Sequence, residues 1–354
     1  MNDSSGDQPA SFERAARAAV AELMAVPANQ VEDMRPLTEG MTNTSFTFSL
    51  RGESQRYVVR LPGPGTEELI DRSAERDAYR AIAPFDLADE VVALDKHGRR
   101  ITVFYEDARV ANPDDDADLA ISMGLIRQLH ALNLPLERRF DIDGMITQYE
   151  GLCAATRQPP YPKLKKTRRR VAELQAFKRQ LDIAEIFCHG DMAAINVLLL
   201  GDGSAKLIDY EYSGQADPIM DVAMYSIIAY YKRERMELAL RLYLEREPTA
   251  LELARLYLYA ALAGYLWSLW AHYKGESGQD FGSYGLDMYN YARRYYRRLM
   301  RSELAEAALN ERAAELGRQA PKRRQAPTDT ASPATERSAT ALAAAGATAQ
   351  GTGQ

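Results

Sequence analysis

The chain contains little cysteine and no apolar run long enough to cross a bilayer. Its 354 residues include two cysteines, Cys153 and Cys188, which have no metal-ligand spacing and are too few for a disulfide framework. An uncharged stretch at 256–271 falls short of the roughly 20 residues that a membrane span needs, so we expect a buried helix there. The N-terminus carries Asp3 and Asp7 where a secretory signal would carry Lys or Arg. These absences predict a cytoplasmic protein without a membrane span.

An excess of basic charge is also missing. The chain has 44 Lys and Arg against 50 Asp and Glu, a net charge of -6, so nothing in its overall charge indicates nucleic acid as a partner. We expect a small-molecule substrate, and the oligomeric state stays open. The basic run at 163–170 fits a solvated loop and helix start better than a docking site for acidic surfaces.

The apolar residues, 46% of the chain, are enough for one large or two smaller domains. Their spacing predicts a helix over 11–24, a helix from an N-cap at Thr66 to about Ala83, and long helices through most of 220–300. Strands are predicted at 46–50, 57–61, 91–94 and 100–105. The expected fold class is therefore α+β, with a small sheet-rich N-terminal lobe, 1–105, and a large helical C-terminal lobe, 106–316. The tail, 317–354, cannot offset its ordering entropy and is predicted to be disordered.

The stretch FCHGDMAAINVLLL places Asp191 and Asn196 five positions apart between apolar segments. The turn GDGS then joins 197–200 to 205–210 as a hairpin, which brings Asp209 back beside Asn196. Phosphoryl transfer needs an Asp to orient the attacking hydroxyl and accept its proton, and an Asn with a second Asp to hold Mg²⁺. Each residue alone is equally well explained by an ordinary turn or strand end, but the ordered set favours phosphoryl transfer.

Two segments resemble a known family. FCHGDMAAINVLL is similar to the catalytic loop, and LIDYEYSGQADPIMDVA to the metal-binding segment, of choline and ethanolamine kinases and of the wider aminoglycoside phosphotransferase-like group. The resemblance covers roughly residues 37–300. It implies a bilobal protein-kinase-like fold, a five-stranded antiparallel sheet over a helical lobe, with ATP and Mg²⁺ in the cleft between them. Asp191 would be the catalytic residue, and Asn196 and Asp209 would bind the metal.

Main-chain contacts to the nucleotide are expected at two places. TEGMTNTSF resembles the family's GGMTN loop, which implies phosphate contacts at Gly40, Thr42 and Asn43, although the segment alone reads as a polar turn. RITVFYEDARV resembles the hinge, which implies that main-chain groups of Val103 and Tyr105 face adenine.

One side-chain contact to the phosphates is also expected. YVVRLPG places Arg60 where protein kinases keep a phosphate-binding Lys, and a guanidinium can bridge phosphate oxygens. Glu75, on the following helix, is its expected partner. The alternative for Glu75 is a solvated acid on a helix face.

Aromatic residues late in the chain predict the acceptor site. The two tryptophans of the chain lie three positions apart on one helix, and a quaternary ammonium must be recognised by aromatic faces and nearby carboxylates. The resemblance to choline kinases implies a choline cage and assigns it Glu211, Tyr212, Trp267, Trp270, Phe281 and Tyr284. Tyr225 and Tyr231 are further candidates. Aromatic stripes on helices are more often core, which is the alternative here.

The function expected is ATP- and Mg²⁺-dependent phosphorylation of choline to phosphocholine. The alternatives are another cationic alcohol, namely ethanolamine, thiamine or an aminoglycoside, and a non-catalytic sensor of choline or nucleotide. A compact Trp-rich cage argues against an aminoglycoside, and the Asp191, Asn196 and Asp209 set argues against a sensor. His130 is expected to be a satisfied core histidine, and His189 to fix the catalytic loop by hydrogen bonds.

Overall fold

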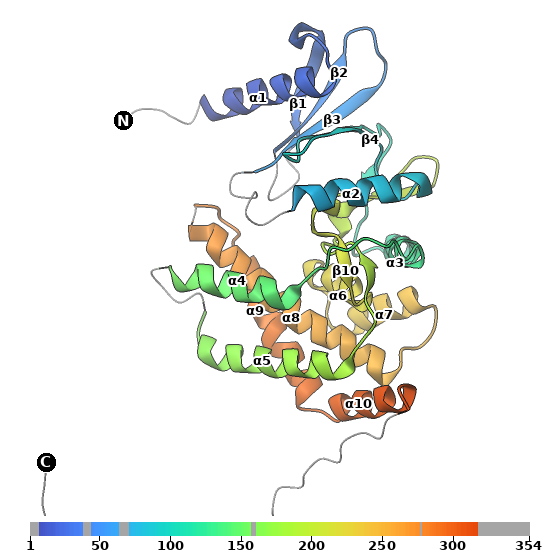
Figure 1. The fold of residues 1–354 in the computed structure, drawn as a ribbon, viewed down its shortest axis with the longest axis vertical. Coiled ribbons are helices and arrows are strands. Elements are labelled where there is room, and N and C mark those ends of the chain that lie inside the picture. Colours follow the sequence, from blue (N-terminus) through green and yellow to red (C-terminus); the bar gives the residue numbers. More distant parts are fainter. Residues whose placement is uncertain (1–6, 38–43, 64–70, 157–160, 277, 318–354) are drawn as a thin grey trace, which may run out of the picture.

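A computed structural model describes residues 7–37, 44–63, 71–156, 161–276 and 278–317. In these ranges the chain forms a small lobe built on a five-stranded sheet and a larger helical lobe (Figure 1). The strands are β1 Val31–Leu37, β2 Thr44–Leu50, β3 Arg56–Leu61, β4 Val91–Leu94, β5 Arg100–Val103, β6 Arg109–Val110, β7 Ile186–Cys188, β8 Val197–Leu199, β9 Ala205–Leu207 and β10 Gly214–Ala216. The α-helices are α1 Asp7–Leu23, α2 Arg72–Ile82, α3 Asp116–Ala131, α4 Ile142–Ala154, α5 Leu164–Leu181, α6 Ile219–Ile228, α7 Arg233–Leu244, α8 Ala250–Glu276, α9 Tyr284–Met300 and α10 Leu304–Glu315.

The sheet of the small lobe has the strand order β1-β2-β3-β5-β4, and every neighbouring pair is antiparallel. Phe46 and Phe48 of β2 and Val59 of β3 form one buried core with Ala16 and Val20 of α1. Helix α1 therefore covers one face of the sheet, at the top of Figure 1. The predicted helix and strands of this lobe are present, with ends shifted by a few residues.

Strand β1 was not predicted from the sequence. Its segment, VEDMRPL, is mostly polar and contains Pro36, so it lacks the apolar alternation of a half-buried strand. It lies at the edge of the sheet and pairs only with β2, and proline is tolerated at an edge because its missing N–H costs no ladder hydrogen bond.

Helix α2 lies between the sheet and the helical lobe (Figure 1). The predicted N-cap at Thr66, which is outside the described residues, is wrong for this helix. Its N-cap is Asp71, whose side chain accepts hydrogen bonds from the amides of Ser73 and Ala74. An Asp at this position satisfies amides that the first helical turn leaves without partners.

The large lobe is organised around α8, which spans 27 residues. Helices α4, α6, α9 and α10 pack on it, and the 256–271 stretch is buried throughout, which confirms the predicted buried helix. Among the described residues no helix is long and apolar enough to cross a membrane.

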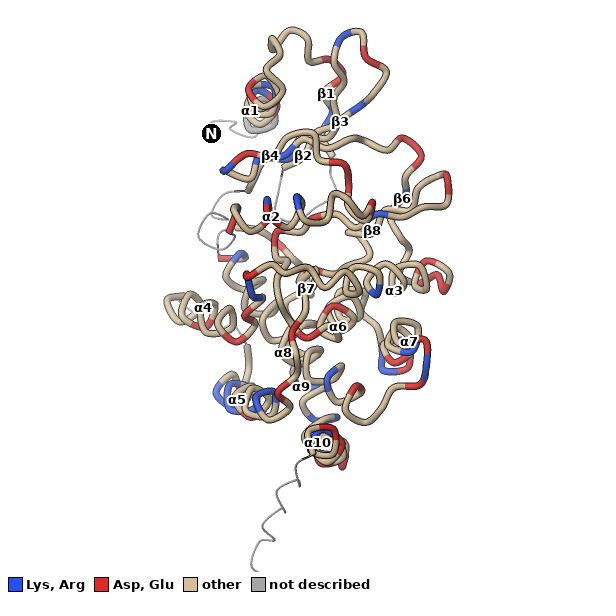
Figure 2. The backbone as a smooth tube through the Cα atoms, turned by 45° about the vertical axis from the view of Figure 1, so that its right-hand side comes forward, with Lys and Arg blue, Asp and Glu red and all other residues tan. Residues whose placement is uncertain are grey.

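The catalytic hairpin predicted from the sequence is present. Strand β8 pairs with both β9 and the short β6, and β7 pairs with β10. The basic run forms the start of α5, where Lys and Arg residues gather (Figure 2). Lys165, Lys166 and Arg169 are exposed. The predicted disorder of the tail concerns residues 318–354, which lie outside the described residues.

Candidate active site

The catalytic loop leaves β7 through a sharp turn at His189 and Gly190. Gly190 has a φ of 81°, which glycine adopts without steric cost, and a Cβ there would collide with the carbonyl oxygen of Tyr212. Asp221 of α6 holds the turn, because its carboxylate accepts the amide of His189 at 2.7 Å and that of Gly190 at 2.9 Å. The turn and this acid together fix the start of the Asp191 segment.

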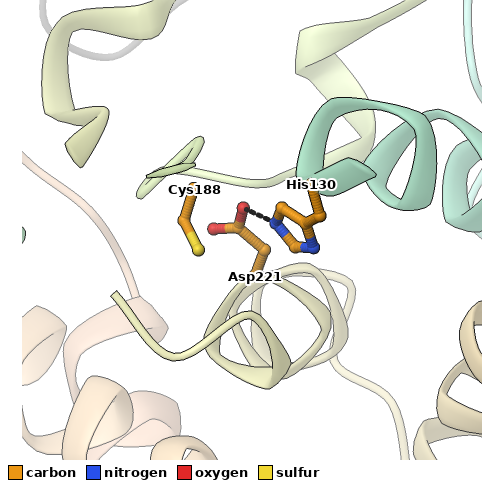
Figure 3. A group of neighbouring side chains, drawn as sticks. All are labelled: His130, Cys188 and Asp221. Carbon is orange, nitrogen blue, oxygen red and sulfur yellow. Dashed lines mark hydrogen bonds and ion pairs between the residues drawn. The ribbon is translucent and has the colours of Figure 1, made fainter. Parts of the chain in front are cut away.

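A buried cluster around Asp221 orients this carboxylate (Figure 3). His130 of α3 lies 3.0 Å from it through Nε2, and the hydroxyl of Tyr243 lies 2.9 Å from Nδ1. The thiol of Cys188 donates to the carbonyl oxygen of Ala216 at 3.5 Å, and burial raises the pKa of Cys188. Burial opposes ionisation of Asp221, but the hydrogen bond and charge of His130, the charge of His189 and the hydrogen bond from the Gly190 amide together outweigh it, so the pKa of Asp221 is lowered. The cluster is structural, and His130 is the satisfied core histidine that was predicted.

His189 fixes the loop from its side chain as well. Nε2 lies 2.9 Å from the carbonyl oxygen of Ile208, and Nδ1 accepts the amide of Asp191 at 3.3 Å. Burial lowers the pKa of His189, so the ring is neutral and donates through Nε2. The prediction that His189 fixes the loop by hydrogen bonds is confirmed.

The hairpin brings the three predicted polar residues together. The amide of Ile208 donates to the carbonyl oxygen of Asn196 at 3.0 Å, which places Asp209 beside Asn196. The side-chain amide of Asn196 donates to the carbonyl oxygen of Asp191 at 2.8 Å, so its own oxygen is directed elsewhere. Burial, with the charges of Asp209 and Glu211, raises the pKa of Asp191 to about 8.

Arg60 of β3 joins the two lobes across the cleft. Its guanidinium contacts Glu75 of α2 through one terminal nitrogen and Asp209 through the other. The predicted Arg60–Glu75 pair is therefore present, and Glu75 is fully buried rather than solvated. Burial opposes ionisation of Asp209, but the charges of Arg60 and Arg100 lower its pKa.

Two further arginines, which were not predicted, meet the same carboxylates. Arg72 of α2 contacts Glu75 at 2.8 Å and Glu211 at 3.0 Å, and Arg100 of β5 contacts Glu75 at 3.4 Å. Glu211 was assigned to the acceptor site, but its carboxylate is held by Arg72 and lies 3.5 Å from Arg60. Glu211 thus belongs with Asp209 in the charged cluster between the lobes.

One cavity of about 590 Å³ is lined by Arg60, Arg100, Asp209 and Glu211 together with Asp191 and Asn196. It extends to residues that were predicted to contact the nucleotide and the acceptor. On the nucleotide side, Val58 from the sheet and Leu198 and Ile208 from the hairpin line it together with the hinge. The amide of Val103 donates to the carbonyl oxygen of Glu90 at 3.0 Å, so this main-chain donor is already used within the protein. The predicted phosphate-loop residues lie outside the described residues, namely Gly40, Thr42 and Asn43.

On the acceptor side, the predicted aromatic residues come together. The ring centroids of Tyr212 and Trp267 lie 5.8 Å apart, those of Trp267 and Trp270 6.1 Å apart, and those of Trp270 and Tyr284 6.3 Å apart. These four side chains line the same cavity as Asp191. Phe281 does not line the cavity but packs on Trp270 at 4.9 Å, which supports that wall from behind.

The two additional cage candidates are wrong. The hydroxyl of Tyr225 lies 3.3 Å from that of Ser122, and the hydroxyl of Tyr231 donates to the carbonyl oxygen of Pro113. Both rings are buried, and neither lines the cavity. Between residues 225 and 231, the residue that lines the cavity is Ile228.

Three important residues of the site were not predicted, and each left only a weak signal. Asp221 is a lone acid in the apolar run IMDVA, which indicates a buried, paired carboxylate. Arg72 precedes Glu75 by three positions on one helix face. Arg100 begins an apolar strand, and only strand pairing, Arg60 with Arg100, reveals that the two guanidinium groups are neighbours.

Replacing Asp221 with Asn is expected to destabilise the protein and loosen the catalytic turn. The amide of Asn can accept only at one oxygen, so one buried N–H loses its acceptor, at a cost of about 1–3 kcal/mol in unfolding free energy. Denaturant unfolding and hydrogen exchange at the His189 and Gly190 amides measure both effects. The matched control is Asp107→Asn at an exposed acid, and equal stability of the two variants would contradict this role of Asp221.

The raised pKa of Asp191 predicts a pH-dependent gain in stability for Asp191→Asn. In the unfolded chain an Asp has a pKa of about 3.9, whereas the folded value is about 8, so the folded state binds more protons between these values. Wild-type stability therefore falls relative to that of the Asn variant as the pH rises through this window. Melting temperatures from pH 4 to pH 9 should diverge, and parallel curves would contradict the shift.

Comparison with known proteins agrees with this geometry. A model of the choline/ethanolamine kinase family matches residues 34–298. Protein LicA of Haemophilus influenzae is 28% identical over 262 residues, which cover 70% of this chain and 75% of the relative. Human ethanolamine kinase 2 is 24% identical over 282 residues, 72% of this chain and 73% of the relative.

A solved structure extends the likeness to the fold. The choline kinase LicA from Streptococcus pneumoniae superposes with a TM-score of 0.71 at 24% identity and covers 81% of this chain and 99% of its own. The predicted α+β, protein-kinase-like fold is thereby confirmed. The family model covers well over half of the chain, so the protein belongs to the choline/ethanolamine kinase family and is a phosphotransferase.

Proposed function

We propose that the enzyme transfers the terminal phosphoryl group of ATP to the hydroxyl of choline, giving phosphocholine and ADP. One observation carries this proposal. Asp191 and the aromatic side chains Tyr212, Trp267, Trp270 and Tyr284 line a single cavity of about 590 Å³. A cation held by the rings therefore keeps its hydroxyl within the same space as a carboxylate that can receive a proton.

Asp191 is the proposed base. Its main chain is fixed by the side chains of His189 and Asn196, so the carboxylate is held ready to orient the acceptor hydroxyl. As the oxygen attacks phosphorus, its proton passes to the carboxylate of Asp191, and the bond from phosphorus to the leaving oxygen of ADP breaks.

Asn196 and Asp209 are the proposed Mg²⁺ ligands, and the donor set fits that ion. Asn196 uses its side-chain N–H on Asp191, which leaves an amide oxygen, and the carboxylate oxygens of Asp209 and Glu211 lie within 4.8 Å of each other. The same carboxylates raise the pKa of Asp191 by repulsion, and a divalent cation relieves this repulsion. Oxygen ligands without thiolates favour Mg²⁺, which when bound neutralises phosphate charge.

The nucleotide is proposed to lie between the lobes. Val58 and Leu198 line the cavity from opposite lobes and suit a planar base, while the carbonyl of Val103 and the amide of Tyr105 would read its edge. Arg60 is proposed to bind phosphate oxygens in bidentate fashion. Glu75 holds its guanidinium at the cleft.

The loop before β2 is proposed to complete the nucleotide site through Gly40, Thr42 and Asn43. Its main-chain amides would approach the phosphates.

The walls of the acceptor site favour choline over ethanolamine. A primary ammonium carries three N–H groups that need acceptors, whereas a quaternary ammonium carries none. The side chains proposed to surround the cation are aromatic, namely Tyr212, Trp267, Trp270 and Tyr284, and the indole N–H of Trp267 is directed at the sulfur of Met224 at 3.1 Å. Among the described cavity-lining residues, the acids are those of the catalytic and charged clusters, namely Asp89, Asp191, Asp209 and Glu211.

This difference predicts a graded response to N-methylation of the acceptor. Each methyl group buried against the rings should raise kcat/KM by about fourfold, from about 0.8 kcal/mol per buried carbon, along the series ethanolamine, N-methylethanolamine, N,N-dimethylethanolamine and choline. ADP release with saturating ATP and Mg²⁺ measures it. Thiamine, an aminoglycoside and an acceptor-free sample complete the panel.

Trp270→Leu should flatten the series by raising the KM for choline while leaving the KM for ATP unchanged. The matched control is Phe85→Leu, because Phe85 is an exposed aromatic residue of the small lobe. A series that peaks at ethanolamine would reject choline as the substrate but keep the kinase chemistry. No ADP release with any acceptor would favour the non-catalytic sensor.

A further inference from the structure

We infer that Tyr79 is a positioning residue for the reaction, whose hydroxyl holds the main chain of the metal-ligand candidate Asp209 in its working conformation. This inference rests on the proposed function for the role of Asp209. Tyr79 lies on α2 in the small lobe and does not line the cavity, so it acts through Asp209 and not on a substrate.

The backbone of Asp209 is in a conformation that its neighbours must maintain. Its φ of 71° and ψ of 62° are left-handed, which for a residue other than glycine costs about 1–3 kcal/mol and persists only when the surroundings enforce it. The amide of Asp209 donates to the hydroxyl oxygen of Tyr79 at 3.1 Å. This hydrogen bond is long-range, crosses from one lobe to the other, and directly fixes the strained residue.

The hydroxyl oxygen of Tyr79 is itself held in position by a second donor. A terminal nitrogen of Arg100 donates to it, and the Arg100 guanidinium lies over the ring at 4.6 Å from the centroid. With two hydrogen bonds accepted, from Asp209 and Arg100, both lone pairs of this buried hydroxyl are used and its oxygen is held in place.

The ring of Tyr79 continues the link toward the catalytic loop. It packs edge-on against Tyr210 with centroids 5.3 Å apart, and Tyr210 lies 4.7 Å from the ring of His189. Glu75, one helical turn before Tyr79 on α2, reaches the same segment through Arg60. Helix α2 therefore fixes Asp209 twice, through its side chain by Glu75 and through its main chain by Tyr79.

The variant Tyr79→Phe tests this inference, since it removes one oxygen and keeps the ring contacts. We expect the variant to fold. Because the amide of Asp209 loses its acceptor, the Mg²⁺ concentration for half-maximal rate should rise about tenfold. The KM for choline should stay unchanged. The affinity for Mn²⁺ in the presence of ADP should weaken to a similar extent. The EPR signal of free Mn²⁺ measures this affinity. The matched control is Tyr295→Phe, because the buried hydroxyl of Tyr295 has no hydrogen-bond partner among the described residues.

The inference is overturned if Tyr79→Phe leaves both the Mg²⁺ requirement and Mn²⁺ binding unchanged. This holds even if the melting temperature or kcat of the variant falls, because such a fall alone would show only a structural role. A second substitution, at Asp209, extends the test. Asp209→Asn weakens the metal site directly, so Tyr79→Phe in that background should add little if the two residues act as one unit. Full additivity would overturn the inference. If wild-type protein fails to phosphorylate choline, the proposed function fails, but Mn²⁺ binding still decides the role of Tyr79.

Discussion

The arrangement of the active site depends on one buried carboxylate, that of Glu75. It is fully buried and meets Arg60, Arg72 and Arg100, and all three arginines reach on to acids of the other lobe. Charges removed from water are costly, and this cost is offset only when the pairs are complete. The cluster therefore fixes how α2, the sheet and the segment after β9 lie against one another.

The same charges explain why the site suits phosphoryl transfer. Burial, and after it the charge of Asp209, raises the pKa of Asp191 and of Glu211. This arrangement of acids reduces folding stability and favours binding of cations. The rest of the structure compensates, because Asp221 and His130 hold the loop from the opposite side with hydrogen bonds that are buried and satisfied.

Much of this could be predicted from local patterns. The hairpin, the order of Asp191, Asn196 and Asp209, the Arg60–Glu75 pair and the Trp267–Trp270 helix all leave short-range spacings in the sequence. What could not be predicted depends on tertiary contacts. Helix α2 has its N-cap at Asp71 and not at Thr66. Strand β1 is stabilised by pairing with β2 and not by its own apolar pattern. The carboxylate of Glu211 is oriented by arginines that are distant from it in the sequence. The position of Ile228 on the cavity likewise follows from helix packing and not from residue type.

The role of Asp191 as the base is the central claim, and comparison of turnover with nucleotide affinity in Asp191→Asn tests it most directly. Choline-dependent ADP release should fall at least about a hundredfold, which is the typical contribution of a positioned general base. Calorimetric affinity for ATP with Mg²⁺ should stay near the wild-type value, because Asp191 is not among the proposed nucleotide contacts. A loss of ATP affinity as large as the loss of rate, or turnover that survives the substitution, would contradict the assignment.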